Sequence, residues 1–239
     1  MEQAEVMTPT GMPDIRLDAD RAAVHVPSGS VVIADLHLGY EWVQRARGQM
    51  VPLGRGDDTA CRLGRLVRRW GARRVVVLGD MVHGMAGWEG VREALVGVLE
   101  RVRGVEWRVV LGNHDRGLAG RLGELGVGNV SWGESWQEPG WVGVHGDHVP
   151  WVPHGERVLS GHEHPAVNVG RAGMGEVRVP AFVVGERGII LPAFSAWAGG
   201  SLAGRRRALG EWARGHAATT YVACMGSRLL AIPAARLAG

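Results

Sequence analysis

The sequence has 239 residues, of which 46% are hydrophobic and 21% are charged. This composition is that of an ordinary globular protein, and it excludes disordered chains, collagen and coiled coils. The longest uncharged run, residues 188–204, is interrupted by proline, serine and glycine, so we expect no membrane span. Because Glu2 and Glu5 stand where a secretory signal needs basic residues, we expect a cytoplasmic protein.

The charged and sulfur-containing residues identify no partner by themselves. All 27 basic residues are arginines, and the formal net charge is +3. Arginine binds phosphate in a planar, bidentate manner, which suits a nucleic-acid partner. The absence of lysine and the presence of 38 glycines are explained better by a bias in nucleotide composition than by a nucleic-acid partner. The two cysteines, Cys61 and Cys224, lie in no C-x-x-C pair, so we expect neither a disulfide framework nor a zinc knuckle.

Apolar runs alternate with amphipathic stretches in the first half of the chain, which is typical of an α/β domain. A hairpin is predicted at residues 15–17 and 22–26, followed by buried strands at 31–34, 75–78 and 107–111. Helices are predicted from a capping segment at 56–59 to residue 70 and over 89–103.

Short strands separated by glycine and proline are predicted beyond residue 130, at 141–144, 157–159, 181–184, 221–225 and 229–232. Neither a linker nor an internal repeat divides the sequence. We therefore expect a single domain over residues 1–239, with a flexible segment of about twelve residues at its N-terminus.

Potential metal ligands follow the successive predicted strands. Open α/β sheets place their sites at the carboxyl ends of strands, where these side chains would meet. Each short motif is weak alone, because a turn or a helix cap often uses the same residues. The series in chain order is D-L-H at 35–37, G-D at 79–80, G-N-H-D at 112–115, His145, and G-H-E-H at 161–164.

The residue types in this series suit a site for two cations. Asp35 and His37 are two residues apart, so on an extended backbone both project to the same side, and His162 and His164 repeat this spacing. The carboxylate of Asp80 has two oxygens that can bridge two cations. Nitrogen and oxygen ligands without thiolate suit Mn, Fe, Zn, Ni or Co.

This motif series resembles that of the calcineurin-like binuclear metallophosphoesterases, over residues 35–164. The resemblance implies an α/β fold in four αββα layers, in which two mixed β-sheets are flanked by helices. It also implies two divalent metal ions, most simply Mn, with Fe, Zn, Ni, Co or Mg as alternatives. One ion would be held by Asp35, His37, Asp80 and His164, and the other by Asp80, Asn113, His145 and His162.

The resemblance also implies a reaction. Two cations about 3.5–4 Å apart activate a water for in-line attack on a phosphoester. His114 resembles the general acid of the family, and Asp115 would orient the His114 imidazole. His114 as a hydrogen-bonding neighbour of the site is the simpler alternative.

His83 indicates which phosphoester is cleaved. The G-D-M-V-H of residues 79–83 is similar to the G-D-L-F-H of SbcD-type nucleases, in which the last histidine lies at the substrate phosphate. Residues 34–41, 161–166 and 191–194 resemble the small Icc-like phosphoesterases, including the ligase-associated, PdeM-type endonucleases of the DNA damage response. The resemblance implies a phosphodiesterase acting on DNA in repair, with a helicase or ligase as a possible partner.

Two other functions stay open. One is a phosphatase or phosphodiesterase for small or cyclic nucleotides, and the other is a scaffold that keeps the fold without catalysis. Several further side chains have a simpler structural explanation, as loop, core or surface residues, although each could contact substrate. These are His148, His154, Trp132, Trp136, Trp141, Trp151 and Arg205–Arg207.

Overall fold

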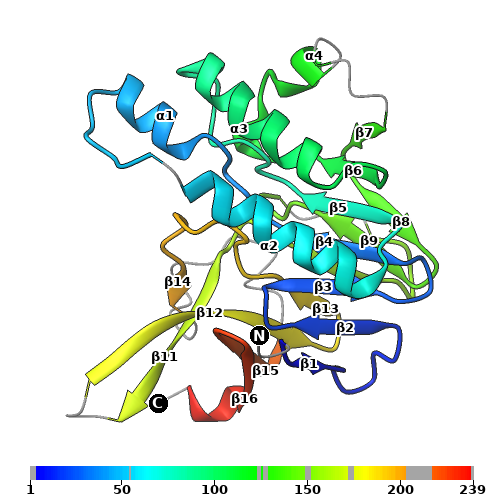
Figure 1. Ribbon diagram of the computed structural model, residues 1–239. Helices are drawn as coiled ribbons and strands as arrows, with labels where there is room; N and C mark the ends of the chain where they lie inside the picture. Colours follow the sequence, from blue (N-terminus) through cyan, green and yellow to red (C-terminus); the bar gives the residue numbers. More distant parts are fainter. Residues whose placement is uncertain are drawn as a thin grey trace.

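Two β-sheets packed face to face form the body of the protein, and helices cover the outer face of the first sheet (Figure 1). The computed structural model describes residues 4–53, 55–122, 125, 129–148, 152–171, 175–202 and 217–237. The helices of this part are α1 (Tyr40–Ala46), α2 (Arg55–Trp70), α3 (Trp88–Arg101) and α4 (Leu118–Leu122). Two 3-10 turns add residues Asn113–Asp115 and Ala234–Arg236.

The first sheet follows the chain in order from β1 to β7. Its first four strands form an antiparallel meander, and β4 to β7 are parallel to one another. The strands are β1 (Val6–Met7), β2 (Ile15–Asp18), β3 (Ala22–His25), β4 (Ser30–Ile33), β5 (Arg74–Leu78), β6 (Glu106–Val110) and β7 (Val130–Gly133).

The second sheet has the order β14-β11-β12-β13-β10-β9-β8, with β15 paired to β12 and β16 paired to β15. At its centre β10 runs parallel to both β9 and β13. Its strands are β8 (Trp136–Glu138), β9 (Trp141–Val144), β10 (Arg157–Ser160), β11 (Pro165–Arg171), β12 (Gly175–Gly185), β13 (Gly188–Ile190), β14 (Ser201–Leu202), β15 (Ala218–Met225) and β16 (Arg228–Pro233).

The inner strands β3 to β5 of the first sheet are buried on both faces because each face meets another layer. In β5, Val75 and Val77 pack under the helices, whereas Val76 and Leu78 pack against the second sheet. The core between the sheets also contains Trp136 and Trp141, both buried, so packing explains these two tryptophans. Trp132 is 38% exposed, and Trp151 and Arg205–Arg207 lie outside the described residues.

The predicted hairpin, the later strands and the two long helices are confirmed to within a few residues. Helix α2 begins at Arg55, before the segment expected to cap it. The sequence analysis missed α1, α4, β1, β7, β8, β11, β13 and β14, most of which are too short to show a period. The two mixed β-sheets, with helices on the first sheet, confirm the predicted α/β fold. The Ala234–Arg236 turn packs against the outer face of the second sheet.

The N-terminal segment differs from the flexible tail that we expected. Its strand β1 pairs with β2, and Met12 is buried. The Glu5 N–H donates to the Ser227 carbonyl, and the Glu5 carboxylate accepts the Leu229 N–H, so residues from Ala4 onward are held between the sheets. No helix in the described ranges combines the length and the apolar character needed to cross a bilayer.

Candidate metal centre

The loops that follow five strands bring the predicted ligands together at one end of the two sheets. Asp35, Asp80 and Asn113 follow β4, β5 and β6 of the first sheet. His145 follows β9 and His162 follows β10 of the second sheet. All seven predicted ligands therefore take part in one set of contacts across the sheets.

Asp35, His37 and His164 form the first group of ligand atoms, all within 4.8 Å of one another. His37 Nε2 lies 3.3 Å from His164 Nε2, and His164 Nε2 lies 3.4 Å from Asp35 Oδ1. His37 Nε2 is also 3.8 Å from Asp80 Oδ2.

Asp80, Asn113, His145 and His162 form the second group. The Nε2 atom of His145 lies 3.0 Å from Asn113 Oδ1 and 3.1 Å from His162 Nδ1. It is also 3.6 Å from Asp80 Oδ1. One oxygen of Asp80 thus faces each group, as a bridging carboxylate requires.

The donor atoms of these groups fit divalent cations. The Leu78 carbonyl, 3.2 Å from His145 Nδ1, can only accept a hydrogen bond, so the proton of a neutral His145 ring belongs on Nδ1. His145 Nε2 then presents a lone pair to the Asn113 and Asp80 oxygens, which also carry lone pairs. A cation at their centre satisfies all three.

The backbone at the site is in a strained conformation. Six described non-glycine residues have a positive φ, and five of them are predicted ligands: Asp35, His37, Asp80, His162 and His164, with φ between 45° and 69°. Such conformations cost about 1–3 kcal/mol each and gather at functional sites. The extended backbone that we expected at Asp35 and His37 is therefore wrong, and left-handed turns aim these side chains instead.

Three glycines, each directly before a predicted ligand, leave room for the site. A Cβ atom at Gly79 would lie 2.0 Å from His145 Nδ1. At Gly112 it would lie 2.4 Å from Asp80 Oδ1, and at Gly161 it would lie 2.8 Å from Asp35 Oδ2. The glycines of the G-D, G-N-H and G-H motifs are thus a steric requirement of the site.

Burial controls the protonation of the site. It lowers the pKa of His37 to about 3, against the opposing charge of Asp35, so this imidazole is neutral and can act as a ligand. Burial also raises the pKa of Asp80, which the charge of His145 partly counteracts. Burial alone would lower the pKa of His164, but the hydrogen bond and charge of Asp35 outweigh it and raise this pKa.

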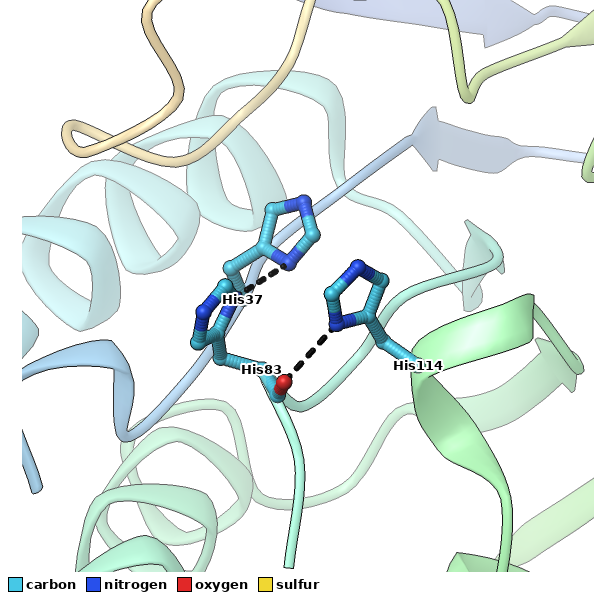
Figure 2. A group of neighbouring side chains, drawn as sticks. All are labelled: His37, His83 and His114. Atoms are coloured by element: carbon cyan, nitrogen blue, oxygen red, sulfur yellow. Dashed lines mark hydrogen bonds between the residues drawn. The ribbon is translucent and has the colours of Figure 1, made fainter. Parts of the chain in front are cut away.

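His83 and His114 lie beside His37, at the edge of the ligand set (Figure 2). Their rings stack with centroids 4.9 Å apart and an interplanar angle of 23°. His83 Nδ1 is 3.3 Å from His37 Nδ1. The His114 Nδ1–H donates to the His83 carbonyl at 2.8 Å, which leaves Nε2 of His114 for another partner.

Asp115 has a different place from the one we predicted. Its carboxylate is buried and accepts the backbone N–H groups of Val82 and Gly112. Burial raises the pKa of Asp115 to about 6, although these N–H groups oppose the shift. The carbonyl of His83 orients the His114 ring instead, because the turn at Asn113–Asp115 directs Asp115 back toward its own backbone.

Three side chains near His83 were missed by the sequence analysis. The Tyr40 ring lies 4.6 Å from the His83 ring, and Gln44 Nε2 is 3.4 Å from His83 Nε2. Trp197 stacks on Tyr40. The only signal for Tyr40 and Gln44 in the sequence is that they closely follow the D-L-H motif, and Trp197 has no such signal. His148 is exposed against Asp147, and His154 is exposed as well.

The comparisons with known proteins agree with this geometry. The model of the calcineurin-like phosphoesterase family matches residues 30–166, more than half of the chain, and this range includes all seven predicted ligands. The chain belongs to the calcineurin-like phosphoesterase family. As a member, it is a metal-dependent hydrolytic phosphoesterase, and the family implies a centre with two divalent metal ions.

The chain was also compared with solved structures and with curated proteins. The crystal structure of Pseudomonas putida nuclease MPE is similar to this calcineurin-like phosphoesterase, with a TM-score of 0.71 and 21% sequence identity. The match covers 96% of this chain and 100% of the nuclease chain, and it shows that the two proteins share a fold. No curated protein matches the sequence significantly.

Proposed function

We propose that this phosphoesterase is a nuclease that hydrolyses phosphodiester bonds in DNA. It would hold two divalent ions, most simply Mn²⁺, at one site formed by Asp35, His37, Asp80 and His164 and another formed by Asp80, Asn113, His145 and His162. The resemblance to ligase-associated endonucleases extends the proposal to DNA repair alongside a helicase or a ligase.

The position of His83 supports a diester substrate. Its ring touches His37 and stacks on His114, so it borders the centre without belonging to either proposed ligand set. A phosphodiester has a second ester group and only two non-bridging oxygens, so the cations hold it less completely than a monoester. An imidazole at this edge can contact the part of the diester that the cations leave free.

In the proposed reaction, the cations and the side chains of the protein have separate roles. When both are bound at the site, the two cations would polarise the phosphoryl oxygens and lower the pKa of a water molecule. His114 would donate a proton to the leaving oxygen. Because the His83 carbonyl holds Nδ1–H of His114, the transferred proton must come from Nε2. Asp115 would act as a positioning residue that holds the turn carrying His114.

A substrate panel tests the proposal directly. The purified protein loaded with Mn²⁺ is offered bis(p-nitrophenyl) phosphate, p-nitrophenyl phosphate, a 2′,3′-cyclic nucleotide and single-stranded DNA. We expect the DNA to be cut and the diester to react faster than the monoester. Preference for the cyclic nucleotide would favour the small-nucleotide phosphodiesterase, and no turnover of any substrate would favour the scaffold.

His83→Ala tests the role of the third imidazole. Because His83 is assigned to the diester, the variant should lose about 10–100-fold in kcat/KM on bis(p-nitrophenyl) phosphate and clearly less on p-nitrophenyl phosphate. His148→Ala is the control, since His148 is exposed against Asp147. Equal loss on both substrates would remove the reason for preferring diesters.

A further inference from the structure

One face of helix α1 lies along the edge of the candidate metal centre. Tyr40, Gln44 and Arg47 are spaced i, i+4 and i+7, so they project from the same side of this helix and its C-cap. The first two contact His83, through a ring contact of 4.6 Å and a polar contact of 3.4 Å. Arg47, the C-cap residue of α1, is exposed on the same side of the helix.

The segment after β13 adds an aromatic surface to this face. The Trp197 ring stacks on Tyr40 with centroids 5.2 Å apart and an interplanar angle of 19°. The Trp197 N–H donates to Ser195 Oγ, and the Ser195 N–H donates to the carbonyl of Asp35. The aromatic pair is thus tied to the backbone of a predicted ligand. Both rings are partly exposed.

The direction of the reaction decides which part of a substrate meets this face. His114 is assigned to the leaving oxygen, and His83 stacks directly on His114. Tyr40 lies against His83, with its ring in contact with that histidine. Helix α1 therefore lies on the leaving-group side of the scissile phosphate.

We propose that Tyr40, Trp197 and Arg47 form a subsite for the nucleotide on the leaving-group side of the scissile bond. The base of that nucleotide stacks on the Tyr40–Trp197 pair, and Arg47 contacts the next phosphate. This inference rests on the proposed nuclease function and adds the residues that select a nucleic-acid substrate. Because a base inside a duplex has no free face, the subsite requires an unpaired nucleotide.

The residue types fit this task. Aromatic rings stack on any base because every base has a π-face. A guanidinium suits a phosphate oxygen better than an amide does. Arg45, five residues after Tyr40, lies on another side of α1, and its guanidinium donates to the carbonyl of Val51. It provides a matched control on the same helix.

The test compares Tyr40→Leu, Trp197→Leu and Arg47→Gln with the controls Tyr40→Phe and Arg45→Gln on two diesters with Mn²⁺ present. One is a single-stranded oligonucleotide with a mapped cleavage site, and the other is bis(p-nitrophenyl) phosphate, which has no base. For Tyr40→Leu and Trp197→Leu we expect the ratio of kcat/KM values, oligonucleotide to small diester, to fall on the order of 10-fold, mainly through KM. Tyr40→Phe, which keeps the ring, should restore the ratio. Arg47→Gln should lower the ratio, because the small diester has no second phosphate, and Arg45→Gln should leave it unchanged.

A second experiment uses an oligonucleotide with an abasic nucleotide at the leaving-group position. The wild-type protein should cut this oligonucleotide about as slowly as Tyr40→Leu cuts the natural one, and Tyr40→Leu should show no further loss on it. Equal losses on both diesters, or an abasic site without effect, would overturn the subsite and leave the nuclease proposal intact. A wild-type protein that hydrolyses the small diester but no oligonucleotide would instead overturn the proposed function itself.

Discussion

Asp80 has the central position at the residue scale, because one of its oxygens faces His37 and the other faces His145. Its Oδ1 also accepts the backbone N–H of His114 at 2.9 Å. One side chain therefore connects both proposed metal groups with the turn that carries the proposed acid.

Asp80→Asn is expected to remove both metal and activity. The amide keeps one oxygen for the His114 N–H but loses the negative charge that two cations share. Bound Mn²⁺ per chain should fall toward zero, and kcat/KM should fall more than about 100-fold. Elemental analysis after gel filtration measures the first effect. Full metal content would contradict the bridging role, and Asp147→Asn, at a solvent-exposed position, is the control.

His114→Ala is expected to separate catalysis from metal binding. The side chain belongs to neither proposed ligand set, so metal content should stay at the wild-type level. Loss of a general acid costs about 10²–10⁴-fold, and the cost falls as the leaving group improves. Rates on a series of diesters with leaving alcohols of rising pKa measure this dependence. A uniform loss across the series would count against proton donation.

At the scale of the element, the glycines that precede the predicted ligands allow neighbouring turns to approach each other closely. Gly112 has φ −102° and ψ 176°, so any residue could adopt its backbone, yet a Cβ there would lie 2.4 Å from Asp80 Oδ1. The requirement at this position is space and not conformational freedom. The turn after β6 can approach the turn after β5 only because the side chain is missing.

Gly112→Ala should therefore displace the Asp80 carboxylate. We expect weaker Mn²⁺ binding and a loss of about 1–3 kcal/mol in the free energy of unfolding. Gly97→Ala is the matched control, because Gly97 lies on the exposed side of α3 with no atom near its would-be Cβ. That change should stabilise the protein by about 0.5–1 kcal/mol. Unchanged metal affinity in Gly112→Ala would contradict the steric argument.

The elements predicted from sequence are those with a strong local pattern. The run R-V-V-V-L at 74–78 is uniformly apolar after Arg74, so it predicts a buried strand at 75–78. The structure confirms this strand as β5. Helix α1 has only seven residues and begins after Gly39 at φ 73°, with no side-chain cap, so nothing local predicts it. Its contacts with His83 depend on the pairing of β4 with β5, which is a tertiary property.

The candidate site, like the fold, was predictable from the sequence only in part. The order of ligands along the chain and the rule for sheet edges together predict the meeting of Asp35, Asp80 and His145. Left-handed turns at the ligands are not predictable, because isolated Asp and His residues prefer other conformations and only the surrounding structure enforces these. The 3-10 turn at Asn113–Asp115 directs the Asp115 carboxylate away from His114, and this too was not predictable from the sequence.

Metal binding should stabilise the whole molecule, because the proposed ligands come from both sheets. Mn²⁺ at about 100 times its Kd would add about 2.7 kcal/mol to the free energy of unfolding. For a chain of this size that is a rise in Tm of roughly 5–10 °C. Thermal melts with Mn²⁺ and with a chelator measure it. A rise of the same size in Asp80→Asn would show that the effect does not come from this site.

The division of ligands between the sheets has a consequence for biosynthesis. Residues 1–138 contain the first sheet with Asp35, Asp80 and Asn113, whereas His145, His162 and His164 belong to the later part of the chain. A nascent polypeptide stalled before His162 would carry five of the seven proposed ligands and would complete neither set. On this assignment, the chain up to His162 must leave the ribosome before either ligand set is complete, so metal loading would follow the docking of the two sheets.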